Sequence, residues 1–481
     1  MEIDYEGMVD LAKMDKQEKD EIRGRLGYDK ILNACKQAQT DGYEWIWVDT
    51  CCIDKRSSAE LSEAINSMYR WYANAKVCYA YLHDVNDSSF PTDKDDKTYR
   101  KSNGRPEWFS RGWTLQEMIA PRNLYFFNKD WQLIGDKERL ARTLERITGV
   151  SEYTLTDGLD RNRPCVAQII SWAANRTTTR VEDRAYSLMG LLDVNMPMLY
   201  GEGKKAFHRL QLEIIRSSND QSIFAWGHDS ENVRIGSILA DDPSFFGDCS
   251  DMELVNHGEF VKEFPEVSST NADHIDVFPI TNRGIQIWMP FRRYRDSGNS
   301  VFKAYLPCRH GVSIDLVLWN SNYYRYPSPW TWNATDLEDS PAKFRQVYFR
   351  YQDTPNHTAT FEIDDSGIID NGSTRSSVDT ENLTSNTFTL TDTNPFCVKT
   401  YSEEPGNGSF EVVFGQCLGL DWVRLNGFSE FPWIDGLSKA RWPDCALSMA
   451  DAPSENSSYD RLWIRHLRLL DQLRSCGLTA P

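Results

Sequence analysis

The sequence predicts an α/β fold with a parallel sheet and a helical extension in the first half of the chain, followed by a β-rich domain. Two observations carry this prediction. A strand, a helix and a strand follow one another between residues 45 and 82, which is the order of a parallel α/β sheet. Beyond Trp226, short strand-like runs alternate with Asn, Ser, Asp and Gly turns, which is typical of β-rich domains.

The first elements follow from apolar spacing. In the segment that begins at Gly27, Ile31, Ala34, Cys35 and Ala38 recur at helical intervals and predict a helix, which Gly42 is expected to end. The run WIWV at 45–48 is dense in aromatic and β-branched side chains. It therefore predicts a buried strand that leads into a turn at Asp49.

The next segment has a clear helix start. Ser57 and Glu60 form an S-x-x-E capping box, which predicts an amphipathic helix. VCYAYL at 77–82 predicts the following strand. Residues 83–106 are polar and charged over a length that is uncommon for a connection, and loops of this length are often functional.

A short helix is expected next, with Ser110 as its N-cap and Pro121 preventing its continuation. LYFF at 124–127 predicts a third strand. We therefore expect an α/β domain at 1–137, a mainly helical extension at 138–230, and a β-rich accessory domain at 231–481 that ends in a helix around 461–473.

Net charge, apolar content and cysteine spacing exclude several classes of partner and ligand. The chain has 481 residues and a net charge of −18, of which residues 231–481 carry −14. An acidic surface repels phosphate backbones and anionic lipid, so we expect no nucleic-acid and no membrane partner. Neither a secretory signal nor a long apolar stretch is present, which favours a cytoplasmic protein. The eleven cysteines lack zinc-site spacing, so we expect no metal and mostly reduced thiols.

The segment WVDTCCIDK is the first candidate site. Asp49 and Asp54 flank Cys51 and Cys52 after the predicted strand at 45–48. Parallel sheets bind ligands beyond the carboxyl ends of their strands, so the two carboxylates are candidate ligand-binding groups. The structural alternative is that Asp49 caps the turn while the cysteines pack into the core.

The segment RGWTLQE is the second. Trp113 and Glu117 are four residues apart and would share one face of a helix. A carboxylate beside an indole suits a ligand with a cationic ring and a scissile glycosidic bond, because the ring can stack while the carboxylate stabilises an oxocarbenium-like centre. The structural alternative is an ordinary solvated carboxylate on a helix.

A third pattern, LYGEGKK, places Gly201 and Gly203 before a helix that begins near Lys205. Backbone amides at a helix N-terminus can cradle a phosphate. The alternative is a helix-start turn with solvated lysines, and a lone G-x-G does not decide between them.

Three long segments stand in the order of a known family: GYDKILNACKQAQTDGYEWIWVDTCCIDKRSSAELSEAINSMYRWYANAKVCYAYL, RGWTLQEMIAPRNLYFF and EDRAYSLMGLLDVNMPMLYGEGKKAFHRLQLEIIRSSNDQSIFAW. Spanning about residues 27 to 226, they resemble the fungal heterokaryon incompatibility (HET) domain. The resemblance implies a role in recognising non-self after hyphal fusion and in triggering growth arrest or cell death. It also implies protein partners and self-association.

The HET domain in turn looks like the TIR domain, which has a flavodoxin-like parallel sheet, and some TIR domains cleave NAD. Their catalytic glutamate lies in a W-x-x-x-E helix, which Glu117 and Trp113 match. The resemblance therefore implies a candidate NAD glycohydrolase that needs no cofactor, with Glu117 as the catalytic residue. Trp113, Arg111, Asp49 and Asp54 are assigned to substrate binding. The alternative is a non-catalytic module that acts by self-association and partner recruitment, and a third is a decayed paralogue.

One departure concerns the start of the domain. The family normally begins with a strand of the type YAILSHTW, and nothing similar precedes Gly27. That strand is interior in a flavodoxin-like order, and each backbone group left unpaired by its loss would cost about 1–3 kcal/mol when buried. We therefore expect either a truncated chain or another segment in that position.

Overall fold

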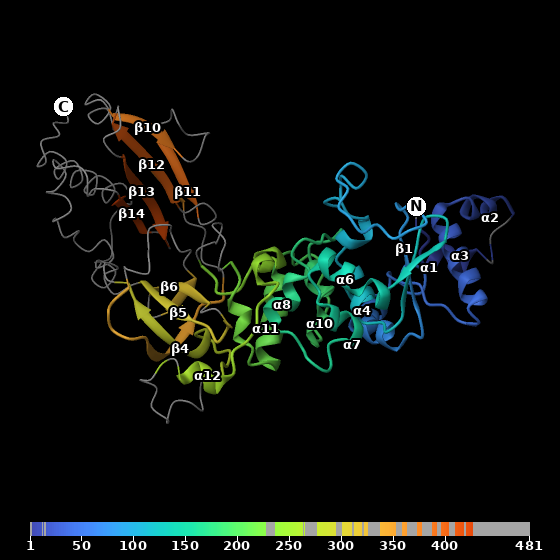
Figure 1. Cartoon of the computed structure of the whole chain (residues 1–481), viewed down its shortest axis with the longest axis horizontal. Coiled ribbons are helices and arrows are strands. Elements are labelled where there is room, and N and C mark those ends of the chain that lie inside the picture. Colours follow the sequence, from blue (N-terminus) through green and yellow to red (C-terminus); the bar gives the residue numbers. More distant parts are fainter. Residues whose placement is uncertain are drawn as a thin grey trace, which may run out of the picture. The chain divides into compact units, whose positions relative to one another are not determined.

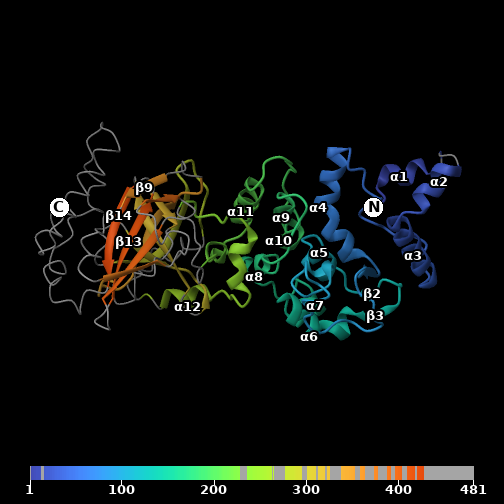
Figure 2. The same cartoon turned by 90° about the horizontal axis from the view of Figure 1, so that it is seen from above.

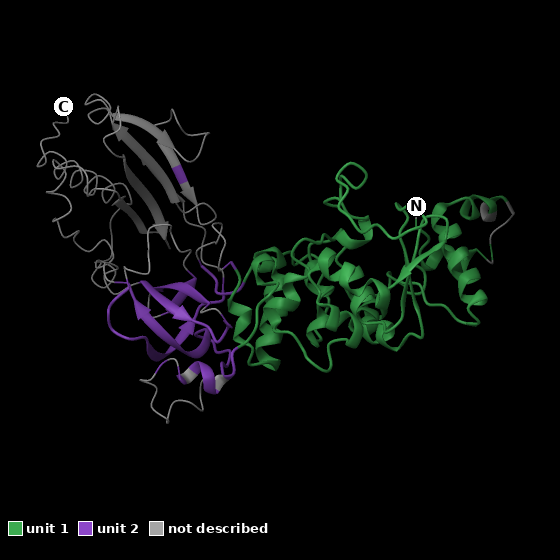
Figure 3. Ribbon diagram, viewed as in Figure 1, with its two compact units in different colours: residues 1–226, 240–254 green, residues 227–239, 255–481 purple. Residues whose placement is uncertain are grey.

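The computed structural model divides the protein into two compact units, one of residues 1–226 with 240–254 and one of residues 227–239 with 255–481 (Figures 1 and 3). The structure describes residues 2–11, 13, 16–227, 236–262, 264, 277–294, 301–309, 312–319, 322–325, 337–352, 358–362, 373–377, 387–391, 396–403, 409–417 and 420–426. Each unit is described by itself.

The first unit is a mixed α/β structure. Helices α1–α3 gather at one end of the unit and α8–α11 at the other, with the sheet and α4–α7 between them (Figures 1 and 2). Its elements are α1 (Tyr5–Asp10), α2 (Lys16–Arg23), α3 (Leu26–Thr40), α4 (Ser58–Asn74), β1 (Cys78–Tyr81), the 3₁₀ helix η1 (Glu107–Ser110), α5 (Thr114–Ile119), β2 (Leu124–Phe127), β3 (Leu133–Asp136), α6 (Lys137–Thr148), α7 (Glu152–Asp157), α8 (Val166–Ser171), α9 (Asp183–Tyr186), α10 (Met189–Leu192), α11 (Lys205–Ser217), η2 (Gln221–Phe224) and η3 (Pro243–Cys249).

Most predicted helices are confirmed. α3 ends where expected, because Gly42 has a positive φ of 83° and the Tyr43 amide donates to the Ala38 carbonyl at 2.8 Å. In α4 the Ser57 hydroxyl accepts from the Glu60 amide at 3.3 Å. Only half of the predicted capping box forms, since Glu60 accepts from the Asp54 amide at 2.9 Å instead of returning to Ser57.

The sheet of this unit has three strands in the order β1-β2-β3. β1 and β2 are parallel, with Cys78 opposite Leu124, as the strand-helix-strand order predicts. β3 runs antiparallel to β2 and was not predicted. The sheet is therefore mixed, and the wholly parallel, flavodoxin-like arrangement is not established.

The predicted strand at 45–48 is wrong, because this segment forms no strand. Trp45 is 89% exposed, whereas Trp47 packs edge-on against Trp71 and Tyr72 of α4, at centroid distances of 5.2 and 5.6 Å. The aromatic and β-branched run that predicted a buried strand instead has one tryptophan facing solvent and one packing on a helix. Packing between aromatic rings can bury a side chain such as Trp47 without the backbone hydrogen bonds of a strand.

The short helix α5 begins later than predicted. Ser110 does not cap it, because Ser110 closes the 3₁₀ helix η1 and its hydroxyl donates to the Glu107 carbonyl at 2.8 Å. The helix begins at Thr114, after a turn at Trp113. Every residue of α5 except Glu117 is buried, so this helix is part of the core.

Contact between α4 and α10 depends on the absence of a side chain at Gly190. A Cβ atom there would lie 2.2 Å from Cβ and 2.9 Å from Cγ of Tyr69. We expect Gly190→Ala to lower the free energy of unfolding by about 1–3 kcal/mol through overpacking, measured by urea denaturation. Gly247→Ala is the control, since its nearest neighbour would be the Ala174 Cβ at 4.0 Å, and equal losses in the two variants would contradict the prediction.

The second unit is rich in β-structure, which confirms the prediction for this half of the chain. Strands β4–β8 form a closed barrel, β10-β12-β13-β14 form a four-stranded sheet and β11 pairs with β9. The predicted last helix at 461–473 lies outside the described residues. The elements are α12 (His257–Lys262), β4 (Ile285–Arg293), β5 (Val301–Tyr305), β6 (Ser313–Trp319), β7 (Asn322–Arg325), β8 (Lys343–Phe349), β9 (Thr358–Glu362), β10 (Ser373–Ser377), β11 (Thr387–Thr391), β12 (Phe396–Glu403), β13 (Ser409–Cys417) and β14 (Leu420–Asn426).

Among the described residues, no helix is both long enough and apolar enough to cross a membrane.

Candidate functional site

Helix α5 holds Glu117 in a fixed position. Its C-terminal carbonyl groups are capped by the buried side chain of Lys137, whose Nζ donates to the carbonyls of Met118 at 3.2 Å and Ile119 at 3.3 Å, and also to that of Pro121. Burial lowers the pKa of Lys137 to about 8. The helix is thus closed at one end by a cation and packed into the core along most of its surface.

Glu117 is a partly buried carboxyl group in unfavourable surroundings. Burial and, to a smaller extent, the nearby negative charge of Asp49 raise its pKa to about 7. Arg111, a hydrogen bond from Trp108 and the charge of Lys30 act in the opposite direction. The hydrogen bond runs from the indole Nε1 of Trp108 to Oε2 of Glu117, over 3.2 Å.

Two further titratable groups lie within electrostatic range of this carboxyl group. Burial raises the pKa of the Tyr72 hydroxyl well above its usual value, and the charges of Glu117 and Asp49 add to the effect. Burial likewise raises the pKa of the Cys78 thiol, again with contributions from Glu117 and Asp49. Neutral groups and two carboxyls therefore share one region, which favours binding of a cation or of a developing positive charge.

The predicted residues Glu117, Asp49 and Arg111 are brought together, since the charges of the latter two both act on Glu117. Trp113 occupies a different position. Its side chain hydrogen-bonds to Asp183 and packs against the cluster of Ile53, Ala64 and Met68. The indole that contacts Glu117 belongs to Trp108, which the sequence did not single out. Trp108 and Glu117 are nine positions apart in the sequence, and their contact depends on the turn between η1 and α5.

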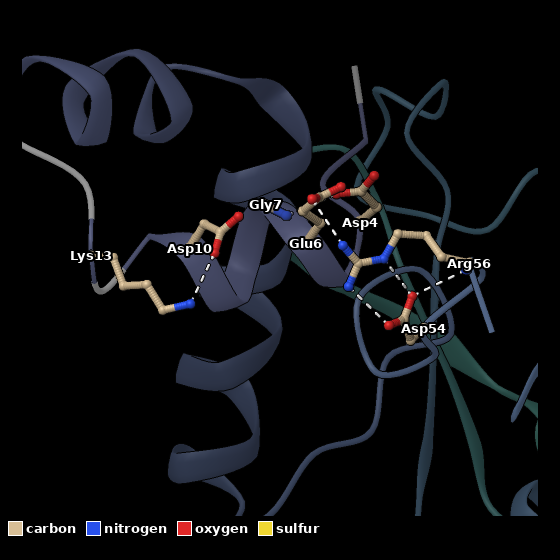
Figure 4. A network of polar contacts seen from close by, with 7 residues as sticks. All are labelled: Asp4, Glu6, Gly7, Asp10, Lys13, Asp54 and Arg56. Carbon is tan, nitrogen blue, oxygen red and sulfur yellow. Dashed lines mark hydrogen bonds and ion pairs between the residues drawn. The ribbon is translucent and has the colours of Figure 1, made fainter.

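Asp54 belongs to another cluster (Figure 4). Both of its oxygens accept from Arg56, at 2.9 Å from Nε and 2.9 Å from Nη2, and these bonds lower the pKa of Asp54. Arg56 also pairs with Glu6 of α1 at 2.8 Å. Asp54 thus takes part in a surface network with α1, and no contact with Glu117 is seen among the described residues.

The Gly201–Gly203 turn is occupied by a carboxylate. Oε1 of Glu182 accepts from the amides of Gly201 at 2.8 Å and Gly203 at 3.0 Å, and these amides help to lower the pKa of Glu182. Both glycines have positive φ, at 103° and 61°. Because the two amides already bind an anionic group of the protein, the structure favours the helix-start turn over a phosphate cradle.

Metal-binding geometry is not found here. Within the part of the chain that the structure describes, no three His, Cys, Asp or Glu side chains are arranged to hold a metal ion.

Comparison with known proteins relates part of the first unit to a known family. Residues 15–106 match the family "Heterokaryon incompatibility protein (HET)". The chain is also 42% identical over 223 residues to "Vegetative incompatibility protein HET-E-1" of Podospora anserina. The chain contains a HET domain. The predicted resemblance is thereby confirmed.

The aligned segment covers 45% of this chain and 16% of the Podospora protein. Residues 205–320, which run from α11 of the first unit into the barrel, match a domain of unknown function, DUF8212. No solved structure matches the chain. Glu117 lies C-terminal to the residues that the HET family matches, so its role rests on its surroundings and on the W-x-x-x-E resemblance.

Proposed function

We propose that this protein acts in vegetative incompatibility and that its HET domain is a TIR-like NAD glycohydrolase, with Glu117 as the catalytic carboxylate. The observation that carries the proposal is the environment of Glu117. Folding places a carboxyl group partly out of water, beside a second carboxylate, and raises its pKa to about 7. Such surroundings cost stability and are common at catalytic sites. The incompatibility role is supported by the HET domain and by the Podospora relative.

The reaction would convert NAD and water into nicotinamide, ADP-ribose and a proton. As the glycosidic bond breaks, its electron pair leaves with nicotinamide, which becomes neutral, and positive charge develops on the ribose. The Glu117 carboxylate would stabilise this charge more strongly than it stabilises the neutral ribose of the ground state, which is the condition for raising the rate. Trp108 would hold the carboxylate in place through its 3.2 Å hydrogen bond.

The remaining assigned residues differ in how well their positions suit substrate binding. Arg111 is exposed and acts on Glu117, so it could bind the pyrophosphate of NAD. Asp49 is partly buried near Glu117 and could accept from a ribose hydroxyl. Trp113 is partly buried by its own packing, so only the exposed part of its ring could contact the substrate. Asp54 is the least suited, because Arg56 occupies both of its oxygens.

Incubation of the purified full chain with NAD tests the proposal. We expect nicotinamide and ADP-ribose to be released in equal amounts, as measured by chromatography. If self-association assembles the site, the rate of release per protein molecule should rise with protein concentration. Absence of nicotinamide at all concentrations, in protein shown to be folded by circular dichroism, would contradict the enzymatic part of the proposal.

A second candidate is a non-catalytic cytoplasmic module that recruits protein partners. The observation that favours it is the exposure of large apolar side chains, since Trp45 is 89% and Leu26 81% exposed. Exposed side chains of this size are typical of interaction surfaces when they gather in patches. The non-catalytic module is the better description if Trp45→Ala abolishes self-association and cell death while no variant changes the rate of NAD cleavage.

A further inference from the structure

A pair of adjacent thiols lies in the turn that follows Trp47. The amides of Cys51 and Cys52 both donate to the Val48 carbonyl, at 3.3 and 2.9 Å, which folds residues 48–52 into a tight turn. Cys52 is exposed, whereas Cys51 is half-buried and packs against the apolar cluster of Ile3, Ile22 and Ile31. The two thiols therefore face different surroundings although they are neighbours in the sequence.

The turn directs two hydrogen-bond donors at the Cys52 sulfur. The Val48 amide donates to Sγ of Cys52 at 3.4 Å, and the Cys51 thiol donates to the same sulfur. The two thiols therefore lie on one turn, with Cys51 as a hydrogen-bond partner of Cys52. Donors aimed at a sulfur stabilise its thiolate form.

We propose that Cys51 and Cys52 form an oxidisable vicinal dithiol site, in which hydrogen peroxide first oxidises Cys52 and Cys51 then closes a disulfide. Nothing in this inference depends on the proposed NAD chemistry.

The two steps balance as follows. The Cys52 thiol first releases its proton to solvent. The thiolate attacks one oxygen of peroxide, the O–O bond breaks, and the departing hydroxide takes up that proton to form water, which leaves a sulfenic acid on Cys52. The Cys51 sulfur then attacks the Cys52 sulfur and expels hydroxide, which takes the Cys51 proton to form water. Two thiols and one peroxide yield one disulfide and two waters. A ring closed by adjacent residues is strained, so a dithiol reductant should reopen it readily.

The protonation states of the pair fit this order of events. Hydrogen bonding from Cys51 lowers the pKa of Cys52 to about 6, against the opposing effects of burial and of Asp49. The same hydrogen bond raises the pKa of Cys51, with burial and the charges of Cys52, Asp49 and Cys35 acting in the same direction. At neutral pH, Cys52 is therefore the nucleophile and Cys51 the protonated partner.

Alkylation by iodoacetamide followed by peptide mapping tests the first step on the full chain. A thiol with a pKa near 6 gains thiolate but loses some intrinsic nucleophilicity, so at pH 6 Cys52 should react about tenfold faster than free cysteine. Cys165, Cys249 and Cys308 are buried and serve as internal controls that should not react in the folded protein. Reaction of Cys52 at the rate of free cysteine would overturn the proposal.

Two variants of Cys51 separate its roles. Cys51→Ser keeps a donor to Cys52 but lacks the second sulfur, so fast alkylation at pH 6 should persist while peroxide leaves a Cys52 sulfenic acid that dimedone traps. Cys51→Ala removes the donor as well, and alkylation at pH 6 should fall towards that of free cysteine. In the wild type we expect a dithiothreitol-reducible disulfide and little dimedone adduct. Equal dimedone trapping in the wild type and Cys51→Ser would show that the thiols do not pair.

Discussion

Glu117→Gln is expected to lower the rate of nicotinamide release by about 10²–10³, because loss of one preorganised charge at the reacting centre typically has an effect of this size. Glutamine has nearly the same shape and keeps an oxygen that can accept from Trp108 Nε1, so the fold should persist. The measurement is the initial rate in the NAD assay at equal protein concentration.

The same substitution should make the protein more stable at neutral and alkaline pH. The pKa of Glu117 is raised from 4.5 to about 7 on folding, so between these values the folded state binds more protons than the unfolded state. Stability therefore falls as pH rises through this range, by up to about 3 kcal/mol for this group. Glutamine does not titrate, and Glu117→Gln should lack this loss when unfolding is measured from pH 5 to 8.

Activity should follow the opposite trend with pH. Only the ionised carboxylate stabilises the cationic ribose, so the rate should rise with pH below about 7 and level off above it. Burial has the largest effect on this midpoint, followed by the charges of Asp49 and Arg111, the Trp108 hydrogen bond and the charge of Lys30.

Glu138→Gln is the matched control. Glu138 is exposed on α6 and no hydrogen bond of its side chain is seen within the described residues, so neither activity nor stability should change. A folded Glu117→Gln protein that cleaves NAD as fast as the Glu138→Gln variant would contradict a catalytic role for Glu117. If that protein also still causes cell death, the interaction module gains support.

Local sequence patterns predicted those elements whose residues interact mainly with close neighbours. α3, α4, β1 and β2 follow from apolar spacing, glycine placement and β-branched or aromatic runs. β3 was missed because its residues, LIGD, are not typical of a strand. Its position depends on a turn in which Asn128 Oδ1 accepts from the amides of Asp130 and Gln132, at 3.0 and 2.9 Å. Such a turn shows no apolar periodicity.

The segment at 45–48 was predicted as a strand and forms none, so here a local sequence pattern indicated the wrong element. Its aromatic and β-branched run predicted a buried strand, but Trp45 is exposed and Trp47 packs on helix α4. Such a composition cannot say whether a covered side chain packs on a strand or on a helix. The residues of the candidate site could likewise be predicted only in part. Resemblance identified Glu117, whereas Trp108 reaches it only through the turn between η1 and α5, which spacing does not reveal.

Arg176→Met is expected to lower the free energy of unfolding by about 2–4 kcal/mol, because it removes buried hydrogen-bond donors. Arg176 is 4% exposed, and its guanidinium donates to the carbonyls of Trp172 at 3.2 Å and Arg111 at 2.9 Å and to the Thr114 hydroxyl at 2.9 Å. Burial lowers its pKa to about 10, so it remains a cation at neutral pH. Methionine fills similar space but leaves the carbonyl groups of Trp172 and Arg111 without these donors.

Arg176 holds the turn that positions the site, which makes its loss more than a local defect. Thr114 Oγ1, which accepts from Arg176, donates to the Trp108 carbonyl at 2.5 Å, and Trp108 in turn binds Glu117. Arg142→Met is the control, because Arg142 is 87% exposed and its ion pair with Glu152 should contribute at most about 1 kcal/mol. Arg176→Lys should recover only part of the stability, since a single ammonium cannot reproduce the planar fork of donors. Urea denaturation that gives Arg176→Met and Arg142→Met the same midpoint would show that this network does not hold the turn.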